Sequence, residues 1–148
     1  MERSDKLKRI GYFSATGLTA LAFLAGGLSD LARAPAVVAG MSHLGYPGYF
    51  ASILGAWKVL GALAIAAPRF PRLKEWAYAG IVFDLTGAAL SHASVGDGVG
   101  KIATPLVLLA FAAASWALRP EKRRLAPTSQ ERAVLRGTIG EPLHAAAR

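Results

Sequence analysis

Two ionisable side chains, Lys58 and Asp84, lie inside long apolar stretches of the sequence. A lone lysine or aspartate at the centre of a bilayer costs about 2.5 to 3.5 kcal/mol, so such residues usually face one another or a polar cavity. Counted from the connection between the two stretches at about 1.5 Å per residue, both lie at similar depth. We therefore predict a Lys58–Asp84 ion pair that either forms a ligand or proton site or fixes the helix register.

Further polar residues gather near the ends of the same stretches. His92 follows Asp84 in the third stretch, and His43 and Tyr46 precede the stretch that contains Lys58. They could form an outward-facing polar pocket above the pair. Two histidines so far apart in sequence are weak evidence for a metal or haem ligand, so we predict no metal site and give them interfacial or proton-handling roles.

Glu75 stands immediately before Trp76 and close to Tyr78, at the start of the stretch that contains Asp84. An acidic residue in the first turn of a helix is stabilised by the helix dipole. Tryptophan and tyrosine are enriched at the membrane interface. We therefore predict that Glu75 is a helix-start acidic residue.

Four apolar runs are long enough to position these residues in a bilayer, whose core of about 30 Å needs about 17 to 25 residues of helix. Hydrophobic residues make up 53% of the 148-residue chain and charged residues only 18%. No alternating pattern indicates a barrel. The sequence predicts an all-α integral membrane four-helix bundle, with spans at residues 10–28, 49–67, 76–93 and 102–118.

Lysine and arginine set the predicted orientation, because cytoplasmic loops are rich in both. Basic groups precede the first run, separate the second from the third, and follow the fourth. All three groups then fall on one side, which puts both termini in the cytoplasm. We predict a basic cytoplasmic segment at 1–9, a membrane domain at 10–118 and a cytoplasmic, disordered tail at 119–148, with a short interfacial helix near 36–44.

Composition and missing motifs exclude several functions. The chain has no cysteine, so thiolate catalysis and iron–sulfur ligation are excluded. Its net charge of +8 comes from residues that flank apolar runs, a pattern that indicates lipid contact and not nucleic-acid binding. Phosphate-binding loops and nucleophile elbows are absent, so we predict no independent catalytic activity.

Five segments combine polar or aromatic residues with apolar ones in a recognisable order: LGYP at 44–47, ILGAWKVLG at 53–61, LKEWAYAG at 73–80, FD at 83–84 and SH at 91–92. Together they resemble the DoxX-like family of small bacterial membrane proteins. The resemblance covers residues 10–118 and implies a four-helix membrane bundle with a loose connection to membrane redox chemistry. The positions that match the family pattern are Tyr46, Pro47, Lys58, Glu75, Tyr78, Asp84 and His92.

These observations lead to one hypothesis and two alternatives. The first is an accessory inner-membrane protein that binds a small quinone-like molecule at a ligand or proton site drawn from Lys58, Asp84, His92, Tyr46 and Tyr78. A quinone is the only cofactor that this hypothesis implies, and a membrane redox enzyme would be its partner. The alternatives are a small proton-coupled solute transporter and a purely structural assembly protein. Glycine and alanine on the helix faces would also support a homo-oligomer.

Overall fold

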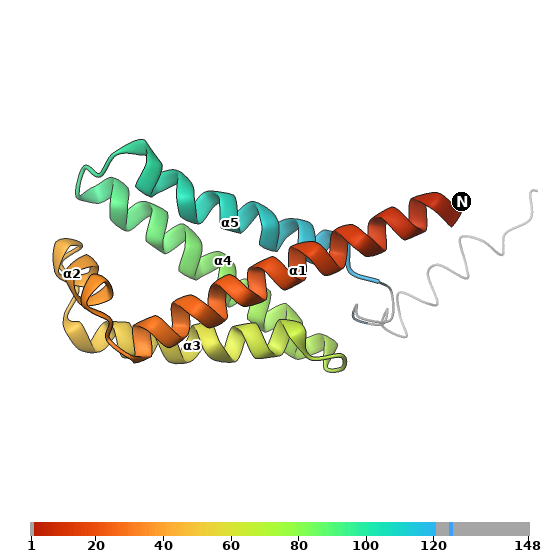
Figure 1. The fold of residues 1–148 in the computed structure, drawn as a ribbon, viewed down its shortest axis with the longest axis horizontal. Helices are drawn as coiled ribbons and strands as arrows, with labels where there is room; N and C mark the ends of the chain where they lie inside the picture. The colour runs from red at the N-terminus through yellow and green to blue at the C-terminus, as the bar shows by residue number, and fades with distance from the viewer. Residues whose placement is uncertain (1, 121–124, 126–148) are drawn as a thin grey trace, which may run out of the picture.

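The computed structural model describes residues 2–120 and residue 125, and no β-strand occurs among them. Four long helices and one short helix follow one another along the chain (Figure 1): α1 Glu2–Leu31, α2 Pro35–His43, α3 Gly48–Ala66, α4 Pro71–Ser94 and α5 Val99–Ala117. The predicted all-α class is confirmed, and α2 forms where the short helix near 36–44 is expected.

Proline and glycine set several of the helix ends. Pro35 and Pro71 occupy the first turns of α2 and α4, where a missing backbone N–H costs little. Gly45 and Gly96 have positive φ angles of 79° and 73° in the connections that follow α2 and α4, a conformation that glycine adopts readily. Because Pro71 starts α4, this helix begins more than one turn before the predicted span at 76–93.

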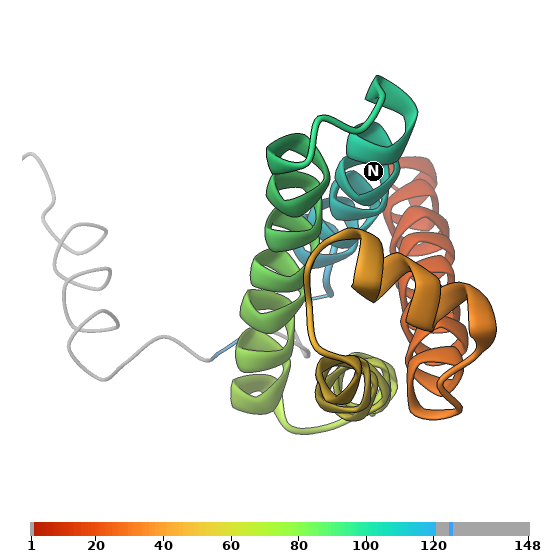
Figure 2. The ribbon, with the colours of Figure 1, turned by 90° about the vertical axis from the view of Figure 1, so that its left-hand side faces the viewer.

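The four long helices pack in a ring, in which α1 contacts α3 and α5 while α4 contacts α5 and α3. Helix α2 packs against α3 and lies across one end of the ring, as Figure 2 shows. We call this the α2 end, which also holds the α4–α5 connection. The opposite end, here the terminal end, holds the N-terminus, the α3–α4 connection and the last residues of α5 (Figure 1).

Helices α1 and α3 approach most closely at two glycines. A Cβ atom on Gly55 would lie 2.7 Å from the carbonyl oxygen of Gly27, and a Cβ on Gly27 would lie 2.9 Å from the carbonyl oxygen of Gly55. Small residues allow membrane helices to pack with their backbones in contact. This crossing brings the last turn of α1 against the middle of α3.

Three helical segments of the described chain are long and apolar enough to cross a membrane: Asp5–Leu31, Gly48–Ala66 and Val99–Ala117. Their outward surfaces carry exposed leucine, phenylalanine and tryptophan side chains, while the buried core includes Phe23, Ile65 and Ile81. Helix α4 is not among the three, because polar residues such as Asp84 and His92 lower its mean hydropathy.

The two predicted terminal segments differ in how far the structure describes them. Helix α1 continues through the basic segment at 1–9, beginning at Glu2, because no proline or glycine interrupts its backbone hydrogen bonds there. Of the predicted tail at 119–148, only Arg119, Pro120 and Leu125 belong to the described residues, so its predicted disorder lies outside them.

Candidate functional site

A cavity of about 660 Å³ lies between α3 and α4, with Phe23 of α1 contributing to its wall. Its lining is apolar except for Lys58 and Asp84. Trp57, Trp76 and Phe83 also line it and are largely exposed, so the cavity opens sideways at the molecular surface. This volume is within the range of about 300 to 1,000 Å³ that is usual for sites of small ligands.

Lys58 forms its ion pair with Asp30 of α1. The distance from Lys58 Nζ to Asp30 Oδ2 is 2.9 Å, and the side chains are 22% and 7% exposed. The prediction of a direct Lys58–Asp84 ion pair is therefore wrong about the partner. The reason is the close α1–α3 crossing, which places Asp30 beside Lys58, whereas the cavity separates α3 from α4 at this level.

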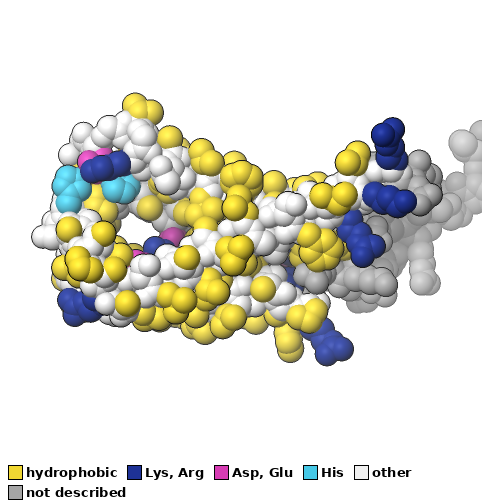
Figure 3. Space-filling model, in the orientation of Figure 1, with side chains coloured by type: hydrophobic (Ala, Val, Ile, Leu, Met, Phe, Trp, Pro, Cys, Tyr) yellow, Lys and Arg dark blue, Asp and Glu magenta, His cyan; other side chains and the backbone are white. Residues whose placement is uncertain are grey.

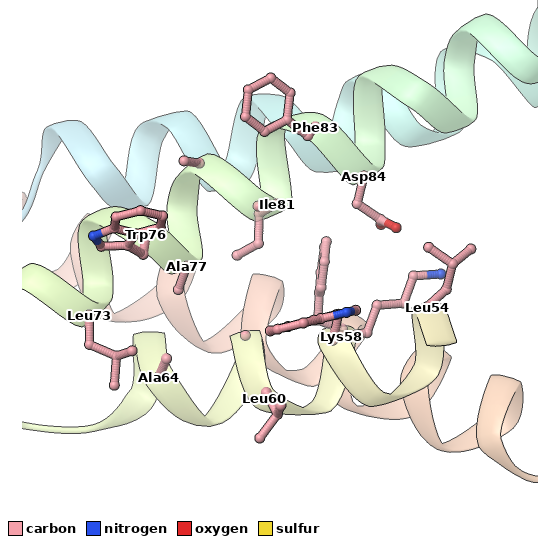
Figure 4. Close-up of a pocket in the computed structure, with 15 residues that line it drawn as sticks. Leu54, Lys58, Leu60, Ala64, Leu73, Trp76, Ala77, Ile81, Phe83 and Asp84 are labelled. Carbon is pink, nitrogen blue, oxygen red and sulfur yellow. The ribbon is translucent and has the colours of Figure 1, made fainter. Parts of the chain in front are cut away.

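Asp84 lies on the opposite wall of the cavity and extends from α4 toward the helix that carries Lys58, as Figure 4 shows. Its side chain is half-buried, and its carboxyl forms no hydrogen bond with any described residue. Figure 3 shows a hollow in one face of the molecule, inside which basic and acidic side chains are visible. Two carboxyl groups and one ammonium group are therefore close together in a mainly apolar environment.

A second charged group lies at the α2 end around Asp97, in the connection between α4 and α5. His43 Nε2 is 3.0 Å from both oxygens of Asp97, and His92 Nδ1 is 2.7 Å from Oδ2. Lys101 Nζ donates to Oδ1 at 2.9 Å. Figure 3 shows histidine, acidic and basic side chains together at this end. We call these four residues the Asp97 cluster.

Hydrogen bonds from Lys101, His92 and His43 hold the pKa of the Asp97 carboxyl well below its usual range. Each donor favours the ionised form of the carboxyl. The predicted neighbours His43 and His92 are thus brought together, although on an aspartate that the sequence patterns did not single out. None of the four residues lines the cavity.

Tyr46 also lies at the α2 end, where its hydroxyl is 2.7 Å from Ser91 Oγ and its ring stacks on Phe50 at 4.7 Å. This contact ties the segment between α2 and α3 to α4. Of the residues predicted for one ligand or proton site, Tyr46 and His92 therefore lie together at the α2 end, separately from the cavity lined by Lys58 and Asp84.

Tyr78 is buried among α1, α4 and α5 and does not line the cavity. Its hydroxyl lies 2.6 Å from Ser115 Oγ, which in turn lies 2.6 Å from Thr16 Oγ1. Hydrogen bonds between polar side chains are a common way to join helices in an apolar environment. The chain of three hydroxyls therefore holds these three helices together.

Glu75 joins α4 to the end of α5. Trp116 Nε1 donates to its Oε2 at 2.9 Å, and Arg119 Nη2 is 2.8 Å from Oε1. The guanidinium of Arg119 also lies 5.2 Å from the ring centre of Tyr78. The prediction that Glu75 is in the first turn of its helix is wrong, because α4 already begins at Pro71, and the first turn of α4 holds no acidic residue.

Lys74 is 1% exposed, although it falls in the predicted connection between the spans at 49–67 and 76–93. Its Nζ donates to the backbone oxygens of Ala64, at 3.1 Å, and Ile65. The last carbonyls of a helix have no partner within the helix, and a cation near them is favourable. Lys74 of α4 thus supplies donors to the C-terminal end of α3.

Residues 14–115 match the DoxX-like family. The chain belongs to the DoxX-like family. This DoxX-like protein is accordingly a membrane protein, in agreement with its three apolar helices. No curated protein and no solved structure that we compared with it is significantly similar to the chain.

Two acidic residues of this DoxX-like protein, Asp30 and Asp97, have central positions that the sequence patterns did not reveal. Asp30 stands just beyond the predicted end of the first span, where a charged residue is unremarkable. Asp30 follows Gly27 by three residues, and residues i and i+3 share a helix face. This spacing was the available signal that Asp30 faces the helix against which Gly27 packs. Asp97 lies in a glycine-rich connection, and only the tertiary structure brings His43 to it.

Proposed function

We propose that this DoxX-like protein crosses the bacterial inner membrane four times, so that α4 spans the membrane in addition to α1, α3 and α5. Helix α4 has 24 residues, which at 1.5 Å per residue gives a length of about 36 Å, enough for a bilayer core of about 30 Å. Asp84 faces the cavity, while α4 packs between α3 and α5. A helix with polar groups directed at its neighbours spans a membrane at lower cost than one that exposes them to lipid.

Both termini are cytoplasmic in this proposal. The N-terminus, the α3–α4 connection and the end of α5 lie together at the terminal end (Figure 1). Exposed basic residues at this end include Lys6, Lys8, Arg69 and Arg72. An excess of lysine and arginine favours the cytoplasmic side, so the α2 end with the Asp97 cluster would face outward.

The function that we propose is binding of a small apolar molecule with a polar head group, such as a quinone, in the cavity between α3 and α4. The observation that supports it most is the cavity itself, which has apolar and aromatic walls and two charged residues, Lys58 and Asp84. Because it opens sideways between two helices, a lipid-soluble molecule could enter from the bilayer. Few polar groups in an apolar pocket are typical of small-molecule sites.

Within membrane redox chemistry the protein would act as an accessory subunit. Its sequence has no cysteine, so the chain offers no thiolate for electron transfer or for an iron–sulfur cluster. A partner enzyme in the same membrane would therefore carry out the redox reaction, and the cavity would hold the lipid-soluble molecule for it.

Native mass spectrometry of the full chain, extracted gently from its own membrane, tests the proposed binding. We expect a bound quinone-like molecule that is lost in the Lys58→Met variant, which removes the hydrogen-bond donor from the cavity wall. Thr86→Val is the matched control, since among the described residues Thr86 bonds to Val82 and Phe83 of its own helix and does not line the cavity. An empty wild-type protein that also takes up no added quinone would contradict the proposal, and the same spectra report whether the chain forms a homo-oligomer.

A proton-coupled transporter is the second candidate. The carboxyl of Asp84 favours it, because no described residue forms a hydrogen bond with that carboxyl. A cavity carboxyl without a hydrogen bond to any described residue is free to exchange a proton with a solute. Solute uptake into proteoliposomes should then respond to an imposed pH gradient and lose that response in Asp84→Asn. A flat response of the wild-type protein would exclude this candidate.

A further inference from the structure

The cavity has two polar groups with unused hydrogen-bonding capacity on facing walls. A lysine ammonium group has three N–H donors, and the one described acceptor of Lys58 is Asp30, at 2.9 Å. Asp84 has two carboxyl oxygens, and neither receives a hydrogen bond from a described residue. One wall therefore offers donors and the other offers acceptors (Figure 4).

Asp30 determines how Lys58 can serve this site. The side chain of Asp30 is 7% exposed and lies against the α1–α3 crossing. A Cβ atom on Gly55 would lie 2.9 Å from the Cβ atom of Asp30. Asp30 itself does not line the cavity. It is therefore a positioning residue, which holds the ammonium group at the cavity wall and neutralises it without blocking the cavity.

We propose that the cavity selects head groups that carry a hydroxyl on an aromatic ring, as in a phenol or a quinol, over the corresponding ketones and ethers. This inference rests on the proposed function and names the ligand class of the same site. A hydroxyl accepts a hydrogen bond from Lys58 and donates one to Asp84 at the same time. A ketone oxygen accepts from Lys58 but leaves the carboxyl of Asp84 without a donor.

The other walls of the cavity fit the rest of such a molecule. Trp57, Trp76 and Phe83 can contact an aromatic ring, and Leu54, Leu60 and Leu73 can contact an alkyl chain. These residues offer no side-chain group that would compete for the hydroxyl except the indole N–H groups of the two tryptophans. Selectivity would therefore depend on Lys58 and Asp84.

A matched pair of probes tests the proposal: a long-chain 4-alkylphenol and its methyl ether, in which a methyl group replaces the hydroxyl hydrogen. Both are titrated against the full chain in detergent micelles, with protein-free micelles as the blank, and binding is followed by tryptophan fluorescence. We expect the wild-type protein to bind the phenol at least about tenfold more tightly than the ether, because one hydrogen bond to a charged group gives an affinity difference of this size.

Variants then assign this preference to its residues. Asp84→Leu should bring the ratio of the two dissociation constants close to one and leave ether binding nearly unchanged. Asp84→Asn should keep part of the preference, because its amide oxygen still accepts a hydrogen bond. Thr86→Val should leave the ratio at the wild-type value.

Three outcomes would overturn the inference or the function beneath it. Equal binding of phenol and ether by the wild-type protein would contradict the selectivity while leaving a small-molecule cavity in place. An undiminished preference in Asp84→Leu would contradict the role of the carboxyl. If neither probe nor a quinone binds, the proposed function itself is wrong.

Discussion

Asp97 and Asp84 lie in different regions of the molecule and have opposite surroundings. Asp97, at the α2 end, has His43, His92 and Lys101 within hydrogen-bonding distance. Asp84, on the cavity wall, has no such contact with a described residue. Water can solvate a carboxylate at a surface, so partners there are optional, whereas in the proposed topology Asp84 lies in the bilayer interior, which offers no substitute. The carboxyl with fewer contacts is therefore the one more in need of a ligand.

Asp30 sharpens this comparison, because it is a second acidic residue beside Lys58 and already has Lys58 as a partner. We expect Asp30→Leu to lower the free energy of unfolding by about 3 kcal/mol, since it leaves the Lys58 ammonium without its counter-ion. Thermal unfolding in micelles, followed by circular dichroism, measures this loss. The double variant with Lys58→Met should recover most of it, and a double variant no more stable than Asp30→Leu would contradict a direct pairing.

Lys74 differs from both Asp30 and Asp84, because its described hydrogen-bond acceptors are backbone carbonyl oxygens. Replacing it with methionine keeps the length of the side chain but removes the donors to Ala64 and Ile65. We expect a loss of about 2 kcal/mol in the free energy of unfolding. The exposed neighbour Arg72 is the control, and Arg72→Met should change stability by less than about 0.5 kcal/mol. Equal effects of the two changes would mean that Lys74 does not hold the end of α3.

The α1–α3 crossing can be tested separately from the charges that it brings together. A methyl group on Gly27 would meet the carbonyl of Gly55 at 2.9 Å, whereas one on Gly26 would meet nothing within 4 Å. We expect Gly27→Ala to lose about 1 kcal/mol or more by overpacking and Gly26→Ala to be neutral or slightly stabilising. The difference in melting temperature between the two variants is the measurement, and its absence would disprove the close crossing.

The Asp97 cluster should give the smallest effect, because it is at the surface and the three partners share one carboxylate. Its depressed pKa means that Asp97 stabilises the folded state fully above the ordinary aspartate pKa of about 3.9, and that this contribution is lost as the pH falls below that value. The melting temperature of the wild-type protein should therefore decline more steeply below about pH 4 than that of Asp97→Asn. Parallel curves for the two proteins would show that the cluster does not contribute to stability.

Local chemistry in the sequence was sufficient for the helices and for finding Lys58 and Asp84. Apolar runs longer than about 17 residues leave little choice but helix, since a backbone in hydrocarbon must satisfy its own hydrogen bonds. The position of the short helix α2 followed from the same segment of sequence. The start of α4 was misjudged because Pro71 permits a helix to begin before the apolar run does.

The partners of the charged residues were decided by the tertiary structure. Matching depths on two adjacent helices made Asp84 a reasonable partner for Lys58, but depth along the axis does not say which neighbour a helix approaches most closely. Gly27 and Gly55 let α1 and α3 come into backbone contact, so Lys58 reached Asp30, and Asp84 was left facing the cavity. Sequence therefore determined which side chains are polar inside the apolar helices, and packing determined which of them remain available to a ligand.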